Sequence, residues 1–382
     1  MTEPEVQQRL IDVLTPEQVN DIERIAAICN NDYDAVEHVS PTGGDTIFTW
    51  DYEQQRAPLV KLYEKAKTSQ WNATTDLDWS IEVDQEKVAA ENAAANIQAQ
   101  MMRESSRNDP SSPLYGWDEQ NFVDLGVQMQ NWTLSQFMHG EQGALVCTAK
   151  IVEQVPWIDA KYYASTQVMD EARHVEVFAR YLDTKLSGHY PINAHLQMLL
   201  DDIIADTRWD MTYLGMQIMV EGLALAAFGF LHMMTTEPLL KKLLRYVMSD
   251  EARHVAFGVL SLKEVYDEMS AAEIRERQEF AFEAAVRMRD RFMQQEVWEH
   301  VGVDQKELVR WFLSRPPVQD QFTPMLFSKI VPNCKKLGLL DAADGWLRDR
   351  FTEIGAIQFE DWVDTGEEYE MLDEVSKDRA AS

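Results

Sequence analysis

One pentapeptide, Asp-Glu-Ala-Arg-His, occurs twice in this chain, at residues 170–174 and 250–254. In each copy a glutamate precedes a histidine by three positions, so on a helix both side chains lie on one face, about one turn apart. A carboxylate and an imidazole in this position can bind one metal ion. At this composition a string of the form Asp-Glu-x-Arg-His is expected by chance in about one chain in a few hundred. Two copies therefore indicate an internal duplication.

Two further glutamates extend the duplication. Glu141 precedes Glu171 by thirty residues, and Glu221 precedes Glu251 by the same thirty. A helix breaker lies near the midpoint of each interval, Pro156 in the first and a Thr-Thr-Glu-Pro string in the second. A helix that runs out from a glutamate, turns halfway and returns brings the two glutamates to the same height. The sequence therefore predicts two helical hairpins that form a four-helix bundle, with four carboxylates and two imidazoles in its core.

The charge of this predicted core favours metal binding. Four buried carboxylates without cations are very unfavourable, whereas two divalent ions neutralise them. Mixed oxygen and nitrogen donors without a thiolate favour iron or manganese over zinc. Surface ion pairs are the alternative, but they explain the aspartates and arginines and leave the paired histidines unexplained. The predicted ligands come equally from the two hairpins: Glu141, Glu171 and His174 for one ion, and Glu221, Glu251 and His254 for the other.

The remaining residues of each pentapeptide are expected to support the ligands. Asp170 and Asp250 can each accept the second N–H of a ligand histidine, in our expectation from the opposite hairpin, which fixes the tautomer of that histidine. Arg173 and Arg253 can neutralise these aspartates.

Helical composition continues over most of the chain. We expect helices over 82–106, 117–153, 158–186, 192–205, 207–234, 237–268 and 271–300, the last starting at a capping box formed by Ser270 and Glu273. Thr15 resembles a helix start, and Thr46–Trp50 is a candidate extended piece. The predicted organisation is an N-terminal extension packed on the bundle (1–80), the bundle (81–300), and a C-terminal helical extension with an acidic tail (301–382).

The segment from Met211 to Met234 has a single formally charged side chain, Glu221, and is long enough to span a bilayer. The alternative is a helix that is apolar all round because it is covered all round. The flanks carry Asp210 and Glu237 instead of basic residues, and a glutamate near the middle of a membrane is costly. The sequence therefore favours a buried helix.

Composition excludes other classes of protein. With 35 Lys and Arg against 65 Asp and Glu, the formal charge is −30, which disfavours binding to nucleic acid or to an anionic membrane surface. The three cysteines lie far apart in the sequence, so neither a disulfide framework nor a Cys zinc site is expected. The chain does not begin with a basic-then-apolar signal. We expect a soluble, cytoplasmic protein.

The duplicated motif resembles the ferritin-like di-iron carboxylate superfamily. The resemblance covers about residues 115–265 and is nearest to the branch with multicomponent monooxygenase hydroxylases, class I ribonucleotide reductase small subunits and acyl carrier protein desaturases. The segment from Leu62 to Trp79 is similar to the sequence that precedes the ligand helices in those reductase subunits. The resemblance implies an all-α, ferritin-like four-helix bundle with a di-metal core and extra N- and C-terminal helices. It also implies two iron ions, or a manganese and an iron ion, that bind dioxygen as co-substrate and generate an oxidant.

Departures from each subfamily leave the reaction open. Phe178 stands where the reductase subunits commonly carry a radical tyrosine, Leu225 where the monooxygenases carry a threonine, and Val247 where arylamine N-oxygenases carry a histidine. The preferred interpretation is a di-iron monooxygenase or oxidase that hydroxylates, desaturates or N-oxygenates its substrate. The alternatives are a radical-generating subunit similar to the reductase small subunits and a non-catalytic iron-binding bundle.

Residues one turn from the ligands are nearly all apolar, which suits a mostly apolar substrate, small or carrier-bound, and excludes water from the oxidant. The alternative is that they are ordinary bundle core. The expected pocket residues are Phe137, Ala144, Leu145, Phe178, Ala224, Leu225 and Phe228. The sequence has no recognisable flavin, nicotinamide or haem site, so we expect a ferredoxin or reductase to donate electrons. A homodimer is compatible with these expectations.

Overall fold

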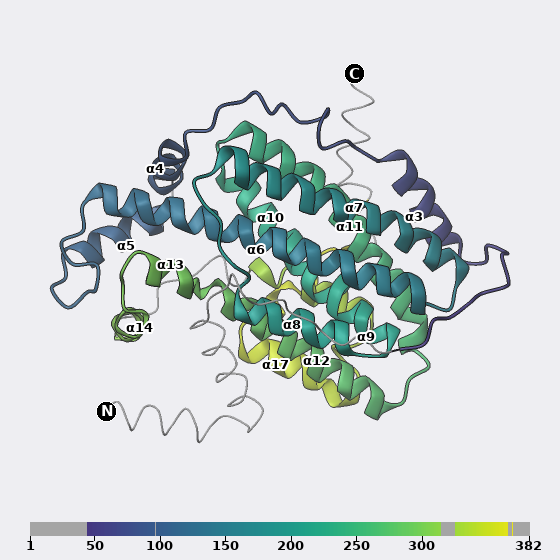
Figure 1. Ribbon diagram of the computed structural model, residues 1–382. Coiled ribbons are helices and arrows are strands. Elements are labelled where there is room, and N and C mark those ends of the chain that lie inside the picture. Colours follow the sequence, from purple (N-terminus) through teal and green to yellow (C-terminus); the bar gives the residue numbers. More distant parts are fainter. Residues whose placement is uncertain (1–43, 96, 315–324, 366–368, 370–382) are drawn as a thin grey trace.

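The computed structural model describes residues 44–95, 97–314, 325–365 and 369. Within these ranges the chain forms helices and no strand, so the predicted all-α class is confirmed (Figure 1). The helix start expected at Thr15 lies outside the described residues. Thr46–Trp50 is not a strand, but Ile47 donates its N–H to the carbonyl of Glu153 at 2.9 Å. This segment therefore lies against the end of the helix that contains Glu153.

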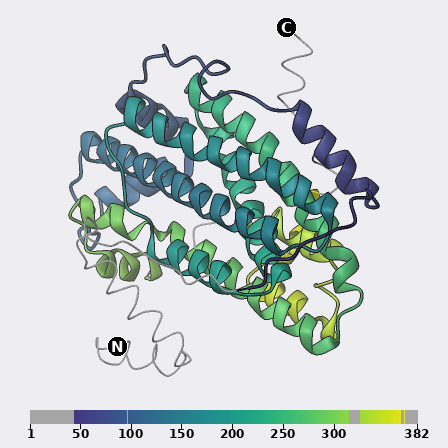
Figure 2. The ribbon, with the colours of Figure 1, turned by 45° about the vertical axis from the view of Figure 1, so that its right-hand side comes forward.

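Two helical hairpins form the centre of the molecule. The first consists of α6 (Glu119–Gln154) and α7 (Ile158–Lys185), which Figures 1 and 2 show side by side. The second consists of α10 (Glu221–Met234) and α11 (Pro238–Tyr266). Glu237 caps α11 by accepting hydrogen bonds from the N–H groups of Leu239 and Leu240, and Pro238 occupies the first helical position. The breakers near the interval midpoints therefore turn both hairpins as the sequence predicted.

The remaining helices cover this centre. They are α3 (Ala57–Thr68), α4 (Gln85–Ala95), α5 (Ile97–Arg107), α8 (Ala194–Ala205), α12 (Ala271–Asp290), α13 (Gln295–His300), α14 (Gln305–Leu313), α16 (Ile330–Lys336) and α17 (Trp346–Glu353), with short 3₁₀ turns η3 (Arg291–Met293), η4 (Ala343–Gly345) and η5 (Ala356–Phe359). The main hydrophobic cluster includes Leu59 and Phe359 as well as the bundle. The main core thus joins the bundle to residues that precede and follow it, and a second, smaller cluster lies around Trp132 and Trp298.

One expected helix is divided. The expected helix 271–300 is formed by α12, η3 and α13, whereas α4 and α5 cover the expected helix 82–106 on either side of residue 96, which lies outside the described residues. The division of 271–300 occurs because Gln294 adopts the left-handed conformation, with φ 52° and ψ 47°. An α-helix of L-residues cannot continue through that conformation. The capping box of Ser270 and Glu273 at the start of α12 is present as predicted.

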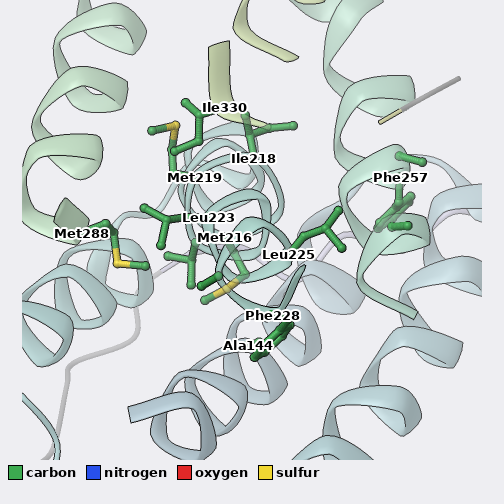
Figure 3. Close-up of a cluster of buried hydrophobic side chains, with 14 of the residues drawn as sticks. Ala144, Met216, Ile218, Met219, Leu223, Leu225, Phe228, Phe257, Met288 and Ile330 are labelled. Carbon is green, nitrogen blue, oxygen red and sulfur yellow. The ribbon is translucent and has the colours of Figure 1, made fainter. Parts of the chain in front are cut away.

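The apolar segment runs without interruption from α9 (Trp209–Tyr213) through a π-helix, η2 (Leu214–Val220), into α10. The segment has 26 residues, and its most apolar 18-residue stretch has a mean hydropathy of 1.7, which is long and apolar enough to cross a membrane, but 78% of that stretch is buried inside the protein. Figure 3 shows its side chains, Leu223 and Phe228 among them, within the buried cluster. The segment is a core helix, as the sequence favoured.

The π-helix ends directly at the predicted ligand Glu221, whose N–H bonds to the carbonyl of Met216, five residues earlier. Helix α11 approaches this turn closely at Gly258. A Cβ at Gly258 would lie 2.7 Å from the Cβ of Gln217 and 3.0 Å from Cδ1 of Ile218. Because a Cβ is fixed to the backbone, it cannot turn aside as a flexible side-chain end would. The glycine therefore permits the packing that positions Glu221.

We expect Gly258→Ala to lower the free energy of unfolding by about 1–3 kcal/mol, the usual cost of overpacking a core. Gly229→Ala is the matched control, because its Cβ would make only an ordinary 3.5 Å contact with the end of Met248. That variant is expected to be neutral or more stable by up to about 1 kcal/mol, since alanine favours the helix. Urea denaturation measures both, and equal midpoints for the two variants would contradict the close packing.

Candidate metal centre

Six buried side chains from the two hairpins converge in the bundle core. Two groups bring their potential ligand atoms within 4.8 Å of one another: Glu141, Glu171, His174 and Glu251 in one, and Glu171, Glu221 and His254 in the other. None of the six is more than 5% exposed. One inward glutamate from each of two helices and one inward Glu-x-x-His from each of their partners is the ferritin-like arrangement. The fold is a ferritin-like helical bundle.

Two of the glutamates lie between the histidines. Glu171 Oε1 is 3.0 Å from His254 Nδ1, and Glu171 Oε2 is 3.4 Å from His174 Nδ1. Glu251 Oε1 is 3.1 Å from His174 Nδ1, and Glu251 Oε2 is 3.6 Å from His254 Nδ1. Glu141 approaches only the His174 side, at 3.2 Å. The sequence divided the ligands between the ions by hairpin, whereas the geometry places Glu171 and Glu251 between the two positions.

Several of these ligand atoms have no hydrogen-bond partner within the described part of the chain. They are Glu171 Oε2, Glu221 Oε2, both carboxylate oxygens of Glu251, and His254 Nδ1. Buried polar atoms are normally paired, and an unpaired carboxylate oxygen is especially costly. Oxygen and nitrogen donors that face one another across a buried space and have no other partner fit metal ions. The residues present therefore suit a two-metal centre.

The electrostatics of the site agree with this fit. Burial and the nearby Glu251 raise the pKa of Glu141 well above its ordinary value, and burial and Glu171 do the same for Glu221. Burial would lower the pKa of His174, but the facing carboxylates, Glu141 first, raise it well above its ordinary value. Without cations the site therefore retains protons, which two divalent ions would displace.

The far side of each histidine is held by an aspartate of the other hairpin. His174 Nε2 lies 3.1 Å from Asp250 Oδ2, and His254 Nε2 lies 3.4 Å from Asp170 Oδ2. This is the cross-hairpin pairing expected from the sequence. It directs the Nδ1 atoms toward the glutamates, because the Nε2 atoms carry the protons.

The arginines of the two pentapeptides contact the same aspartates. Arg173 Nη2 lies 2.5 Å from Asp170 and 2.9 Å from Asp250, and Arg253 pairs with Asp250 as well. Although burial raises the pKa of Asp250, Arg253 and its other partners hold that pKa well below its ordinary value. Asp250 therefore stays ionised and accepts the proton of His174.

Three polar residues of the site were not predicted. Gln167 Nε2 donates to Glu171 Oε1 at 2.9 Å and to Glu221 Oε1 at 2.8 Å. Gln167 precedes Glu171 by one helical turn, a signal that was available in the sequence. Trp71 Nε1 donates to Asp250 at 2.7 Å, and Gln70 Nε2 donates to Asp170 at 2.9 Å. Both lie just after α3, in the segment similar to the reductase subunits.

A small cavity of about 20 Å³ lies beside the glutamates, enough for about one water molecule. Four of the seven predicted pocket residues line it: Phe137, Ala144, Ala224 and Phe228. The other three lie elsewhere. Leu145 is half-buried on the outer side of α6, and Leu225 packs in the core (Figure 3). Phe178 lies behind Phe137 and Phe228, with ring centroids 6.0 Å and 5.8 Å away.

We expect Asp250→Asn to weaken metal affinity about 10- to 100-fold, the usual effect of losing the hydrogen-bond partner of a ligand histidine. The amide carries no charge, so it holds the His174 proton less strongly. Competition with a coloured chelator measures the affinity. Asp183→Asn is the control, because Asp183 is exposed and pairs with the exposed His189. An unchanged affinity in Asp250→Asn would contradict this role.

No protein-family model matches the chain, and no curated protein matches it. Among solved structures, 31 chains match. An R2-like ligand-binding oxidase with an aerobically reconstituted metal cofactor after photoconversion is 18% identical, with 75% of this chain and 94% of that chain covered and a TM-score of 0.48. A point mutant of such an oxidase with an anaerobically reconstituted Mn/Fe cofactor is 19% identical (75% and 94% covered, TM-score 0.49). One with an aerobically reconstituted Mn/Fe cofactor after a long soak is 18% identical (72% and 93%, TM-score 0.45).

Proposed function

We propose that this protein is a di-metal oxidoreductase that uses dioxygen to oxidise a mostly apolar organic molecule. The observation that carries the proposal is the set of six buried ligands, several of whose lone-pair atoms have no other partner in the described residues. Their donor types suit two iron ions or one manganese and one iron ion. When bound, these ions would supply the electrons that reduce dioxygen. Glu141 and Glu221 would serve one ion each, and Glu171 and Glu251 would serve both.

The protein contributes orientation and the exclusion of water. Asp170 and Asp250 fix the tautomers of the two histidines, and Gln167 holds Glu171 and Glu221 at a constant separation. Phe137 and Phe228, with ring centroids 4.6 Å apart, close the cavity beside the glutamates. An apolar wall protects an oxidant from water and favours an apolar substrate group next to it. Hydroxylation, desaturation and N-oxygenation are all compatible with these residues.

Radical generation is the second candidate, and Tyr163 is the observation that favours it. Its hydroxyl is fully buried and has no hydrogen-bond partner among the described residues. Burial raises the pKa of Tyr163, whereas the nearby His254 favours its ionised form. Phe178, at the usual position of the radical tyrosine, is a point against this candidate. Electron paramagnetic resonance after exposure of the loaded protein to oxygen separates the two: a stable tyrosyl signal that Tyr163→Phe abolishes would favour radical generation.

Oxygen uptake tests the proposed function. Metal-free protein is loaded anaerobically with ferrous iron, or with equal amounts of manganese and ferrous iron, and then mixed with oxygenated buffer. We expect about one dioxygen to be consumed for each two-metal centre, and no consumption by a Glu171→Ala, Glu251→Ala double variant. An iron-storage bundle would instead continue to consume oxygen while excess ferrous iron is supplied. Absence of uptake by fully loaded protein would contradict the proposal.

A further inference from the structure

Arg291 is a buried arginine at the cavity beside the metal ligands. It begins η3, the short turn between α12 and α13, and it is 3% exposed. It lines the same cavity as Glu141, Glu221 and Glu251. Its Nε has no hydrogen-bond partner, and no carboxylate or carbonyl of the described residues pairs with its guanidinium. The central carbon of its guanidinium lies 4.8 Å from the centroid of the Phe292 ring.

The acidic residues closest in sequence to Arg291 are paired elsewhere. Asp290 pairs with Arg289 at 2.7 Å. Glu296 accepts hydrogen bonds through both oxygens, from Trp132 Nε1 at 2.9 Å and from Asn193 Nδ2 at 2.8 Å. Neither is available to the guanidinium of Arg291.

Other buried arginines of this protein differ from Arg291 in having carboxylate partners. Arg253 pairs with Asp250, and Arg277 Nη2 lies 3.0 Å from Asp210. Burial lowers the pKa of Arg291 to about 9, which still leaves the side chain charged at neutral pH. The described residues provide no counter-ion for this buried charge, and an unpaired buried charge is costly. Arg291 therefore has the properties of a group whose partner is a ligand.

We propose that Arg291 binds the carboxylate of a small organic monoanion whose apolar part occupies the cavity beside the metal ligands. A guanidinium presents two parallel N–H groups that match the two oxygens of a carboxylate. One buried cation balances one negative charge, whereas a phosphate monoester carries nearly two. Apart from Gln136 and the three glutamate ligands, the other side chains that line the cavity are apolar, Phe137, Val220 and Phe228 among them. The inference rests on the proposed function and names its substrate class, an organic carboxylate.

The size of the cavity sets a condition on binding. Its volume of about 20 Å³ admits about one water molecule, so a larger ligand must displace a wall. Phe137 and Phe228 meet edge to face at the cavity, and rotation of either ring about its side-chain bonds would enlarge it. Small acids are therefore the appropriate first ligands.

Binding of model acids tests the proposal on protein loaded with zinc, which has no redox chemistry. Isothermal titration compares butyrate and benzoate with butyramide and benzamide, their neutral isosteres. We expect the acids to bind at least about tenfold more tightly than the amides. Arg291→Met is expected to weaken acid binding about 10- to 150-fold, the equivalent of a hydrogen bond between charged groups, and to leave amide binding unchanged. Arg289→Met is the matched control and should retain wild-type affinity, because Arg289 pairs with Asp290.

Two further measurements keep the test decisive. If Arg291→Met does not fold, Arg291→Lys replaces it, since lysine keeps the charge but not the two parallel donors, and an intermediate affinity for the acids is expected.

The same titrations are repeated on metal-free protein. Equal affinities for acid and amide, or an acid affinity that the Arg291 variants leave unchanged, would overturn the proposal. Acid binding that disappears with the zinc and ignores Arg291 would assign the carboxylate to the ions and would overturn it too. If the protein consumes no oxygen but still binds the acids through Arg291, the result would contradict the proposed oxidase function and leave the carboxylate site intact.

Discussion

Replacing Glu171 with alanine is expected to remove both metal ions from the protein, not one. The two oxygens of Glu171 lie 3.0 Å from His254 Nδ1 and 3.4 Å from His174 Nδ1, so one carboxylate contributes to both metal positions. Its loss leaves each position with fewer donors and removes a negative charge that reduces the repulsion between the two cations. Elemental analysis of purified protein should find about two ions per chain in the wild type and well under one in Glu171→Ala.

Two other glutamates provide the comparison. Glu221 belongs only to the His254 group, so Glu221→Ala is expected to retain about one ion per chain. Glu176 is on the same helix as Glu171 but is exposed, and Glu176→Ala should keep the wild-type content. Equal losses in Glu171→Ala and Glu221→Ala would show that Glu171 does not lie between two ions.

Removal of the metal is expected to lower the thermal midpoint of unfolding by about 5 °C. A ligand that binds only the folded state at 1,000 times its dissociation constant stabilises that state by about 4 kcal/mol. Because the entropy of unfolding grows with chain length, each kcal/mol shifts the midpoint of a chain of 382 residues by about 1.2 °C. Dialysis against a chelator, followed by differential scanning calorimetry with and without added metal, measures the shift. Identical midpoints would contradict metal binding in the core.

The pH dependence of the metal-free protein follows from the raised pKa values. Glu141, Glu221 and His174 bind protons more tightly when the protein is folded. Stability from such groups is complete below their unfolded pKa values, about 4.3 for Glu and 6.5 for His, and is lost as pH rises toward the folded values. The thermal midpoint of unfolding of the metal-free protein should therefore decrease as the pH rises from about 5 to about 8. The pKa of Glu171 is lowered, so the stability that this group contributes is lost only as the pH falls below this window.

The duplicated motif predicted the architecture because it combines two periodicities. The Glu-x-x-His spacing fixes one face of a helix, and the thirty-residue interval fixes the height of the return, so Glu141 and Glu171 had to meet. The pairing of His174 with Asp250 followed from the same symmetry. The positions of Glu171 and Glu251 between the histidines did not follow, because they depend on the distance across the bundle, which spacing within one helix does not contain.

The pocket shows where a rule based on one helix fails. Ala144 and Leu145 are adjacent, as are Ala224 and Leu225, and neighbours on a helix point about 100° apart. Only one member of each pair can face the cavity, and in both pairs it is the alanine. The π-helix before Glu221 also escaped prediction. It packs closely against Gly258 of another helix, and the sequence of one helix does not contain that contact.

Anomalous diffraction from a crystal of the iron-loaded protein is the most direct test of the metal centre. Data collected at the iron edge should show two peaks about 3.5–4 Å apart, with Glu171 and Glu251 between them and Nδ1 of His174 and His254 as nitrogen ligands. A single peak, or peaks away from these residues while the six side chains bond only to one another, would contradict the account.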